Sequence, residues 1–367
     1  NVYLDRDDGG ALANGNFTVD GDLFFTFMQY PQGGGSPALL RVGGNLVGTN
    51  GFSGTLLLGY GYDNNAGLNL LVYGDIKVTV VVLSGGDSST ANAGNGGSCW
   101  CYGHAVIPYF ESQGGDSYST GFDAGHGGQA YFVGNLNSEG EIYLDGGYAY
   151  GASAGNGGYL EVYGSANIDD LYLRGGSCDA TANTHCAGYG GNLDVYGDLT
   201  FYGCYLYGGD VNGDLSGAGS SNSGSAPNGG YLYAKGSVSG YYIETYGGDI
   251  YTTPYSPSSA GNGGGVYIEG NVSLSTDSGG YIDSSGGYSY NSDAHSGSGG
   301  YVDIYGGISA YEIYSYGGSN DGSGNAITST TGALDVNIKS SGVTQPVSAA
   351  SLPLPTGAAT SALQTTG

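Results

Sequence analysis

The stretch GGYLEVYG, residues 157–164, decides the fold, because close variants of it return along the chain. The variants are GGSCWCYG (96–103), GGQAYFVG (127–134), GGNLDVYG (190–197), GGYLYAKG (229–236), GGGVYIEG (263–270) and GGYVDIYG (299–306). Each begins with two glycines, continues with side chains of alternating character and ends on a glycine. Recurrence of this kind is typical of a repeat architecture, in which each repeat packs on its neighbours.

The alternation within the unit predicts a β-strand with one buried face. Successive strand side chains point to opposite faces, so each unit places two residues inward with one outward residue between them. The inward pairs carry no charge, whereas the residues between them are mainly polar or aromatic. The pairs are Phe17/Val19, Leu40/Val42, Leu70/Val72, Cys99/Cys101, Ala130/Phe132, Leu160/Val162, Leu193/Val195, Leu232/Ala234, Val266/Ile268, Val302/Ile304 and Leu334/Val336.

The residues after each unit predict how the repeats connect. The closing glycine is followed by a small polar residue, as in Gly197-Asp198 and Gly270-Asn271, which is a corner signal. A second apolar stretch, another glycine doublet and a polar segment of variable length follow, so the period drifts from about 29 to 39 residues. An antiparallel sandwich or propeller would not keep one register through so many copies.

The sequence therefore predicts an all-β fold, a right-handed parallel β-helix (β-solenoid) of about eleven irregular coils with variable loops on one edge. At the spacing of stacked strands, eleven coils would extend roughly 50 Å. From about Ser340 the chain lacks tyrosine and glycine doublets and is rich in Ser, Thr, Ala and Pro. We expect the β-solenoid domain over residues 1–339 and an extended arm or linker over residues 340–367.

Composition narrows the classes of partner. The chain has 78 glycines and 36 tyrosines, and its 32 acidic residues outnumber six basic ones, for a formal net charge of −26. A surface of that sign repels phosphate backbones and anionic lipids, so nucleic acid is a poor partner. No apolar run approaches the roughly 20 residues that span a bilayer, so we expect no membrane insertion.

The cysteines raise two questions of pairing. Cys178 and Cys186 flank a short polar loop and would close it as a disulfide in an oxidising compartment, or remain as two free thiols. Cys99 and Cys101 point to one face of a strand, and we expect them in the core. A zinc site there would need two further ligands, and none is suitably spaced.

The acidic residues supply two candidate sites. Asp210, Asn212 and Asp214 place oxygen ligands at alternate residues, as calcium loops do, but the segment lacks the expected glycine and the distal glutamate, so a solvated loop is the simpler interpretation. Glu161 and Asp194 are outward at the same position of consecutive repeats, about 5 Å apart, the separation that retaining glycosidases use. Such neighbours also arise by chance in an acidic protein. Calcium is the one candidate cofactor, and we expect no enzyme activity, because no catalytic motif is present.

Five tyrosines occupy equivalent places just before the corner, at Tyr73, Tyr102, Tyr163, Tyr196 and Tyr305. Cross-strand packing on the sheet surface is the simplest explanation. The alternative is a contact surface for a neighbouring subunit or for sugar rings, since tyrosine buries area while keeping a polar tip.

The C-terminal string VTQPVSAASLPLPTGAATSALQTTG resembles linker segments in tail, fibre and other virion proteins of tailed bacteriophages. The remaining chain resembles the glycine-rich β-helices of phage fibres, tailspikes and bacterial adhesins. This resemblance implies a structural protein at the virion surface or in an extracellular location. It would assemble with copies of itself or with other virion subunits, and it would adhere to a host surface or cell-surface glycan through exposed loops and tyrosines. The alternatives are a bacterial or archaeal extracellular filament or adhesin subunit and, less favoured, a polysaccharide depolymerase. No catalytic residue is carried over.

Overall fold

The computed structural model describes residues 2–4, 16–29, 38–49, 56–59, 61, 63–179, 187–212, 226–251, 259–275, 279–290, 295–317, 328–329 and 334–335. Every strand pairing in these ranges is parallel, and their regular elements are all β-strands. The predicted all-β class is confirmed for this part of the chain. It contains no helix of a length and hydropathy suited to crossing a membrane. The arm predicted over residues 340–367 lies outside the described residues.

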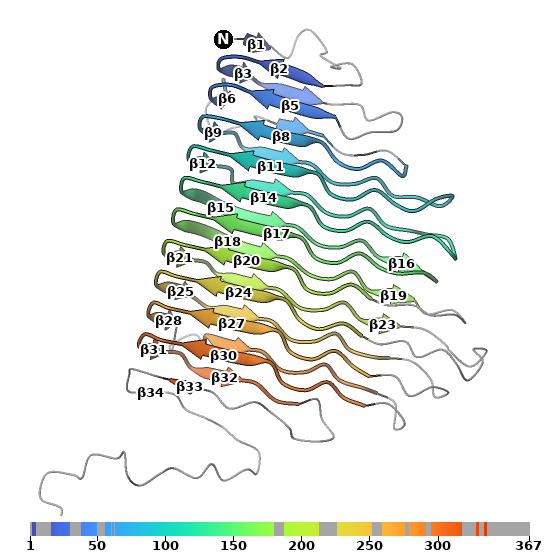
Figure 1. Cartoon of the computed structure of the whole chain (residues 1–367), viewed down its shortest axis with the longest axis vertical. Coiled ribbons are helices and arrows are strands. Elements are labelled where there is room, and N and C mark those ends of the chain that lie inside the picture. Colours follow the sequence, from blue (N-terminus) through green and yellow to red (C-terminus); the bar gives the residue numbers. More distant parts are fainter. Residues whose placement is uncertain are drawn as a thin grey trace, which may run out of the picture. The chain divides into compact units, whose positions relative to one another are not determined.

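The recurring eight-residue units form an eleven-stranded parallel sheet (Figure 1). Neighbouring strands pair residue for residue, so that Leu160 lies beside Ala130 on one side and Leu193 on the other. In spatial order the strands are β2 (Phe17–Val19), β5 (Leu39–Val42), β8 (Asn69–Val72), β11 (Ser98–Cys101), β14 (Gln129–Phe132), β17 (Tyr159–Val162), β20 (Asn192–Val195), β24 (Tyr231–Ala234), β27 (Gly265–Ile268), β30 (Tyr301–Ile304) and β33 (Thr328–Ser329).

The second apolar stretch of each repeat forms a twenty-stranded parallel sheet. It consists of two ladders that the long strands β15 (Leu136–Tyr143) and β18 (Ala166–Tyr172) join. The first ladder also contains β1 (Val2–Leu4), β3 (Leu23–Phe25), β6 (Leu46–Gly48), β9 (Ile76–Lys77), β12 (Ala105–Val106), β21 (Leu199–Thr200), β25 (Val238–Gly240), β28 (Val272–Leu274), β31 (Ile308–Ser309) and β34 (Leu334–Asp335). The second contains β4 (Phe27–Gln29), β7 (Leu56–Leu58), β10 (Val80–Val82), β13 (Tyr109–Glu111), β22 (Gly203–Tyr205), β26 (Tyr242–Glu244), β29 (Tyr281–Asp283) and β32 (Glu312–Tyr314).

The main apolar core lies between these two sheets. The predicted inward residues from Val19 to Ile304 are buried, and Phe17 is half-buried against the same cluster. The outward residues between them are exposed or half-buried, from Thr18 to Asp303. The predicted alternation is therefore confirmed for ten of the pairs.

The eleventh predicted pair, Leu334/Val336, is wrong. Leu334 pairs with Ile308 in the twenty-stranded sheet, and the last strand of the eleven-stranded sheet is β33, which pairs with β30. Both sheets alternate apolar and polar residues, so an apolar pair by itself does not distinguish them. Val336 lies outside the described residues.

A ladder of polar side chains connects the corners that follow the closing glycines. At most of these corners the side chain accepts the backbone N–H of the equivalent residue in the next repeat, as Asn45 Oδ1 does from Asp75 at 2.8 Å and Asp75 Oδ1 does from His104 at 2.8 Å. Further along, Asn135 Oδ1 accepts from Ser165 at 3.0 Å. The small polar residue at the corner thus satisfies a backbone donor that the turn leaves without a strand partner.

Beyond the core the two sides of each repeat come into direct backbone contact at a glycine waist. We call a waist glycine outgoing when it follows the second apolar stretch of a repeat, and returning when it precedes the next eight-residue unit. The N–H groups of the returning glycines donate to the carbonyl oxygens of the outgoing glycines at 2.8–3.1 Å. In order, the donors are Gly94, Gly125, Gly155, Gly188, Gly261 and Gly297, and the acceptors are Gly86, Gly115, Gly147, Gly176, Gly248 and Gly287. Outgoing glycines donate in turn to the preceding returning glycine, as Gly147 does to Gly125 at 2.9 Å. A Cβ on Gly155 would lie 1.7 Å from the carbonyl oxygen of Gly125, so the waist leaves no room for a side chain at that position.

Past the waist, the described residues of the variable segments form a second, smaller core. It contains the three-stranded parallel sheet of β16 (Ala149–Tyr150), β19 (Cys178–Asp179) and β23 (Val211–Asn212). The cluster comprises Ala124, Ala149, Ala154, Cys178, Ala187, Val211, Ala226, Ile250 and Ala260. The segments predicted as loops therefore begin and end in ordered, buried structure.

Candidate binding grooves

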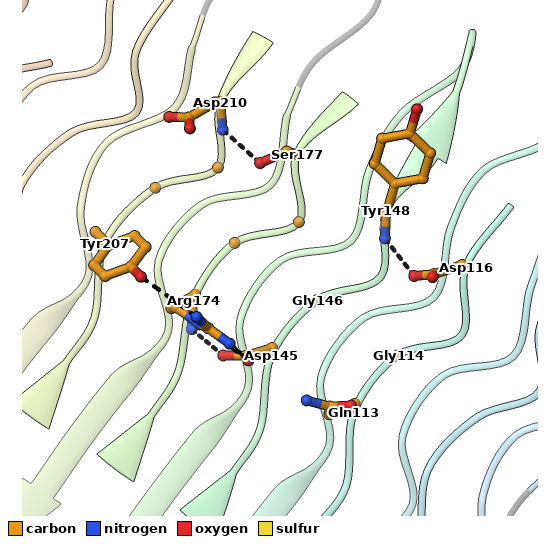
Figure 2. A pocket seen from close by; sticks show the side chains of 14 residues that line it. Gln113, Gly114, Asp116, Asp145, Gly146, Tyr148, Arg174, Ser177, Tyr207 and Asp210 are labelled. Atoms are coloured by element: carbon orange, nitrogen blue, oxygen red, sulfur yellow. Dashed lines mark hydrogen bonds and ion pairs between the residues drawn. The ribbon is translucent and has the colours of Figure 1, made fainter. Parts of the chain in front are cut away.

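The glycine doublets leave two grooves on the surface, since the residues on either side of a doublet carry side chains and the doublet does not. The first, which we name the acidic groove, lies next to the twenty-stranded sheet and encloses about 430 Å³. Figure 2 shows its polar residues on either side of the glycine backbone. Those before the doublets are Gln113, Asp145, Arg174 and Tyr207, and those after them are Asp116, Tyr148, Ser177 and Asp210.

The charged groups of the acidic groove are engaged with neighbours from the protein. Arg174 Nη2 lies 2.6 Å from Asp145 Oδ2, and Nη1 donates to the Tyr207 hydroxyl at 3.4 Å (Figure 2). Asp116 Oδ1 accepts the backbone N–H of Tyr148 at 2.7 Å. Burial raises the pKa of the Asp116 carboxyl above its ordinary value. These contacts connect successive repeats, so the polar residues of the acidic groove serve mainly to hold neighbouring repeats together.

The second groove, which we name the amide groove, is larger, about 750 Å³, and its lining includes four glycine doublets at 96–97, 127–128, 157–158 and 190–191. Its first wall is Asn95, His126, Asn156 and Tyr189, and its second is Asn69, Ser98, Gln129, Tyr159 and Asn192. The lining contains no Asp, Glu, Lys or Arg. The amide groove therefore offers amides, hydroxyls and bare peptide groups to a ligand.

Aromatic side chains continue the surface beyond the second wall. Trp100 and Tyr131 stack with ring centroids 3.9 Å apart at 20°, and Tyr131 meets Tyr159 edge-on at 5.5 Å. Trp100 is 41% exposed and is the single tryptophan of the chain. An apolar platform thus lies next to a polar groove, an arrangement suited to ligands with both hydroxyl edges and C–H faces.

The five tyrosines predicted as a contact surface lie on the outside, each 38–52% exposed. Tyr73 stacks on Tyr102 at 5.3 Å and Tyr163 on Tyr196 at 4.9 Å, with nearly parallel rings. Tyr305 meets Tyr267 at 5.2 Å. The structure therefore brings four of the five together as two pairs and separates Tyr305 from the others, because other residue types, such as Val133 between Tyr102 and Tyr163, occupy some repeats.

The acidic pair Glu161 and Asp194 is placed side by side by the register of β17 and β20. The Tyr159 hydroxyl donates to Asp194 Oδ2 at 2.5 Å. Burial raises the pKa of the Asp194 carboxyl, the hydrogen bond from Tyr159 opposes this, and the charge of Glu161 raises it further. The predicted juxtaposition is confirmed. A role in catalysis stays a hypothesis.

Two of the three residues predicted as calcium ligands, Asp210 and Asn212, lie within the described residues. Asp210 Oδ1 accepts the backbone N–H of Asp249 at 2.9 Å, and Asn212 lies in β23. Asp214 lies outside the described residues. Within the described ranges, no three His, Cys, Asp or Glu side chains are grouped as a metal site would require. The structure gives Asp210 a stacking role and leaves the calcium proposal untested.

The cysteines in the described ranges are buried. Cys99 and Cys101 lie in the main core, as predicted, and burial raises the pKa of the Cys101 thiol to about 12. Cys204 also lies in this core, within β22. Cys178 belongs to the second core, and its proposed partner Cys186 lies outside the described residues, so the disulfide stays a prediction.

Neither the two grooves nor the second core follows from the repeat pattern of the sequence alone. The available signal was the tripeptide Ala-Gly-Asn, which recurs at 93–95, 154–156 and 260–262 and places a buried alanine before a waist glycine. The asparagine that follows lines the amide groove in the first two copies. The signal for the grooves was the glycine doublet flanked by polar residues on both sides.

Comparison with known proteins gives no assignment for this chain. No protein-family model, no characterised protein and no solved structure matches it significantly. The proposals below therefore rest on the geometry and chemistry of the chain.

Proposed function

We propose that the chain is a right-handed parallel β-solenoid and a non-enzymatic structural protein of a virion appendage or surface fibre. The observation that carries the proposal is the in-register parallel pairing of consecutive repeats, which extends from β2 to β33. Parallel strands joined by crossovers are almost always connected with a right hand. A repeat whose N–H and C=O groups are used by its neighbours forms a stiff, extended element suited to a fibre.

The contacts between repeats support an architectural role. Corner side chains, stacked tyrosines and the waist glycines each connect one repeat to the next, and even the charged residues of the acidic groove take part. In this proposal the protein functions at the virion surface or in an extracellular location. The arm over residues 340–367 docks on another copy or on another virion subunit, and the exposed tyrosines and loops provide adhesion.

A bacterial or archaeal extracellular filament or adhesin subunit is the alternative within the same architecture. The particle in which the chain resides separates the two, because a virion appendage requires a capsid or tail protein as neighbour. The acidic pair favours a further candidate, a polysaccharide depolymerase with Glu161 and Asp194 as its carboxylates. Release of reducing sugar that Glu161→Gln abolishes would support that candidate.

Electron cryo-microscopy of the native particle tests the proposal by locating residues 340–367. Density for this arm on an adjacent copy, or on a capsid or tail protein, is the expected result. An arm folded back on its own repeats, together with a monomeric isolated protein by light scattering, would overturn the assembly role.

A further inference from the structure

The polar atoms of the first wall of the amide groove are fixed in orientation by the stacking of repeats. Asn95 Oδ1 accepts the backbone N–H of His126 at 2.8 Å, and His126 Nδ1 accepts that of Asn156 at 2.9 Å. Asn156 Oδ1 accepts the N–H of Tyr189 at 3.0 Å. One acceptor atom on each of three successive side chains is therefore used by the protein.

The atoms that remain on this wall are donors. They are the Nδ2 amide groups of Asn95 and Asn156 and the Nε2–H of His126, whose tautomer follows from the hydrogen bond that Nδ1 accepts. Within the described residues these donors make no hydrogen bond to the protein. They recur once per repeat, at the strand spacing of about 4.8 Å. A row of equally spaced donors matches a polymer that carries oxygen acceptors at regular intervals.

The floor of the amide groove keeps that row accessible. A Cβ on Gly158 would lie 2.2 Å from the carbonyl oxygen of Gly128, and a Cβ on Gly191 would lie equally close to that of Gly158. The floor thus stays free of side chains, and a ligand can approach the peptide backbone closely. Its volume of about 750 Å³ is ample for several sugar rings.

Charge decides which polymer fits. No Lys or Arg lines the amide groove, while Glu161 and Asp194 lie just beyond Tyr159, and the whole chain carries a net charge of −26. Anionic polymers are therefore repelled. The stacked rings of Trp100 and Tyr131 next to the groove provide faces for the C–H surfaces of sugars.

We infer that the amide groove binds a neutral, hydroxyl-rich polysaccharide chain laid along the stack of repeats. The donors on Asn95, His126 and Asn156 contact its oxygen atoms, and the rings beside the second wall contact its sugar faces. The inference deepens the adhesive part of the proposed function and rests on it, because it names the surface and the class of receptor. It requires no cleavage of the polymer.

The substitution Asn156→Asp tests the inference without disturbing the stack. Aspartate keeps an oxygen for the N–H of Tyr189, while it replaces the amide donor by a carboxylate oxygen. The matched control is Asn135→Asp, since Asn135 Oδ1 accepts a backbone N–H from Ser165 in the same way at the corner, away from the amide groove. Circular dichroism confirms that both variants fold.

The measurement is the fluorescence of Trp100 in the isolated full chain, titrated with cello-, malto-, manno- and galacto-oligosaccharides, and with polygalacturonate as an anionic probe. At least one neutral series is expected to shift the emission, with binding about tenfold weaker in Asn156→Asp and unchanged in Asn135→Asp. Absence of any response, equal effects of both variants, or preference for polygalacturonate would overturn the inference.

A shift that depends on protein concentration alone would also overturn it, because a second copy would then cover the surface. Light scattering on the same samples reports assembly separately from sugar binding. Failure of the glycan proposal is thereby distinguished from failure of the structural role.

Discussion

The apolar core and the glycine waist are two ways of holding the same repeats together. In the core the sheets are separated by side chains, and the inward pair varies from Leu160/Val162 to Cys99/Cys101 or Leu232/Ala234. In the waist the two sides touch through peptide groups, and five of the six returning positions between 125 and 297 are glycine. Side-chain packing accepts different shapes of similar volume, whereas direct backbone contact strongly favours glycine, and Asn65 and Pro227 are the exceptions at returning positions in the described residues.

The largest effect is expected for Gly155→Ala in the waist. The new Cβ would lie 1.7 Å from the Gly125 carbonyl oxygen, and neither backbone can move without breaking its hydrogen bonds to adjacent repeats. We expect the free energy of unfolding, measured with urea, to fall by about 3 kcal/mol or more. The control is Gly307→Ala, where the atom nearest to the added Cβ is Asn271 Oδ1 at 3.4 Å. Equal losses in both variants would contradict the tight contact at the waist.

A smaller effect is expected for Leu160→Ala in the core, at about 2–4 kcal/mol. Leu160 is fully buried, but the loss of its side chain leaves a cavity that neighbours partly fill without breaking the strand pairing. Leu160→Met, which nearly conserves volume, should cost less than about 1.5 kcal/mol. Urea midpoints of the two variants check the order. If Leu160→Ala costs more than Gly155→Ala, the comparison between the regions is wrong.

Acidification should stabilise both regions through buried carboxyls. Burial raises the pKa of Asp210 beside the waist and of Asp283 in β29 over the core. A raised pKa means that the folded state binds the proton more tightly, so this contribution is present at low pH and is lost as the pH rises through the folded pKa. The urea midpoint should therefore rise as the pH is lowered from neutrality toward the ordinary aspartate pKa of about 4. Asp210→Asn and Asp283→Asn should each flatten this dependence, and a midpoint that falls on acidification would contradict the assignment.

The smallest effect is expected for Pro227→Gly. Pro227 occupies a returning waist position but has no N–H for the Gly209 carbonyl, so the alternating series of peptide hydrogen bonds is interrupted there. Glycine would add a hydrogen bond that stabilises the folded state by about 1 kcal/mol. Its greater backbone freedom in the unfolded chain would destabilise the folded state by about 0.4–1 kcal/mol. The net change in stability should be near zero. Hydrogen exchange of Gly248 should nevertheless slow, and unchanged exchange would show that the interruption is without effect.

The sequence predicted the repeated strand well because its cause is local. Alternation within GGYLEVYG identifies which residues are buried, and the same register recurs in every copy, so the eleven-stranded sheet and Glu161 beside Asp194 followed directly. The last strand was misplaced because an apolar pair such as Leu334 and Val336 fits either sheet.

The waist and its grooves depend on contacts between segments, which local patterns do not contain. A glycine doublet has the same sequence whether it forms a corner or touches another backbone, as Gly146 and Gly147 do. The donors of Asn95 and His126 became visible only once their acceptor atoms were seen to be occupied. Asn-Gly punctuation would have suggested turns in any fold.

The corner ladder has a consequence for how the length of the molecule can change. The backbone N–H of Asn135 donates to His104 in the repeat before it, and its side-chain Oδ1 accepts the N–H of Ser165 in the repeat after it. A corner of this kind therefore offers the same donor to the preceding repeat and the same acceptor to the following one. Duplication or excision of one whole repeat restores that fit, whereas a change of a single residue between corners does not. We therefore expect such a chain to lengthen or shorten by whole repeats, and to tolerate changes of other lengths only in the segments past the waist.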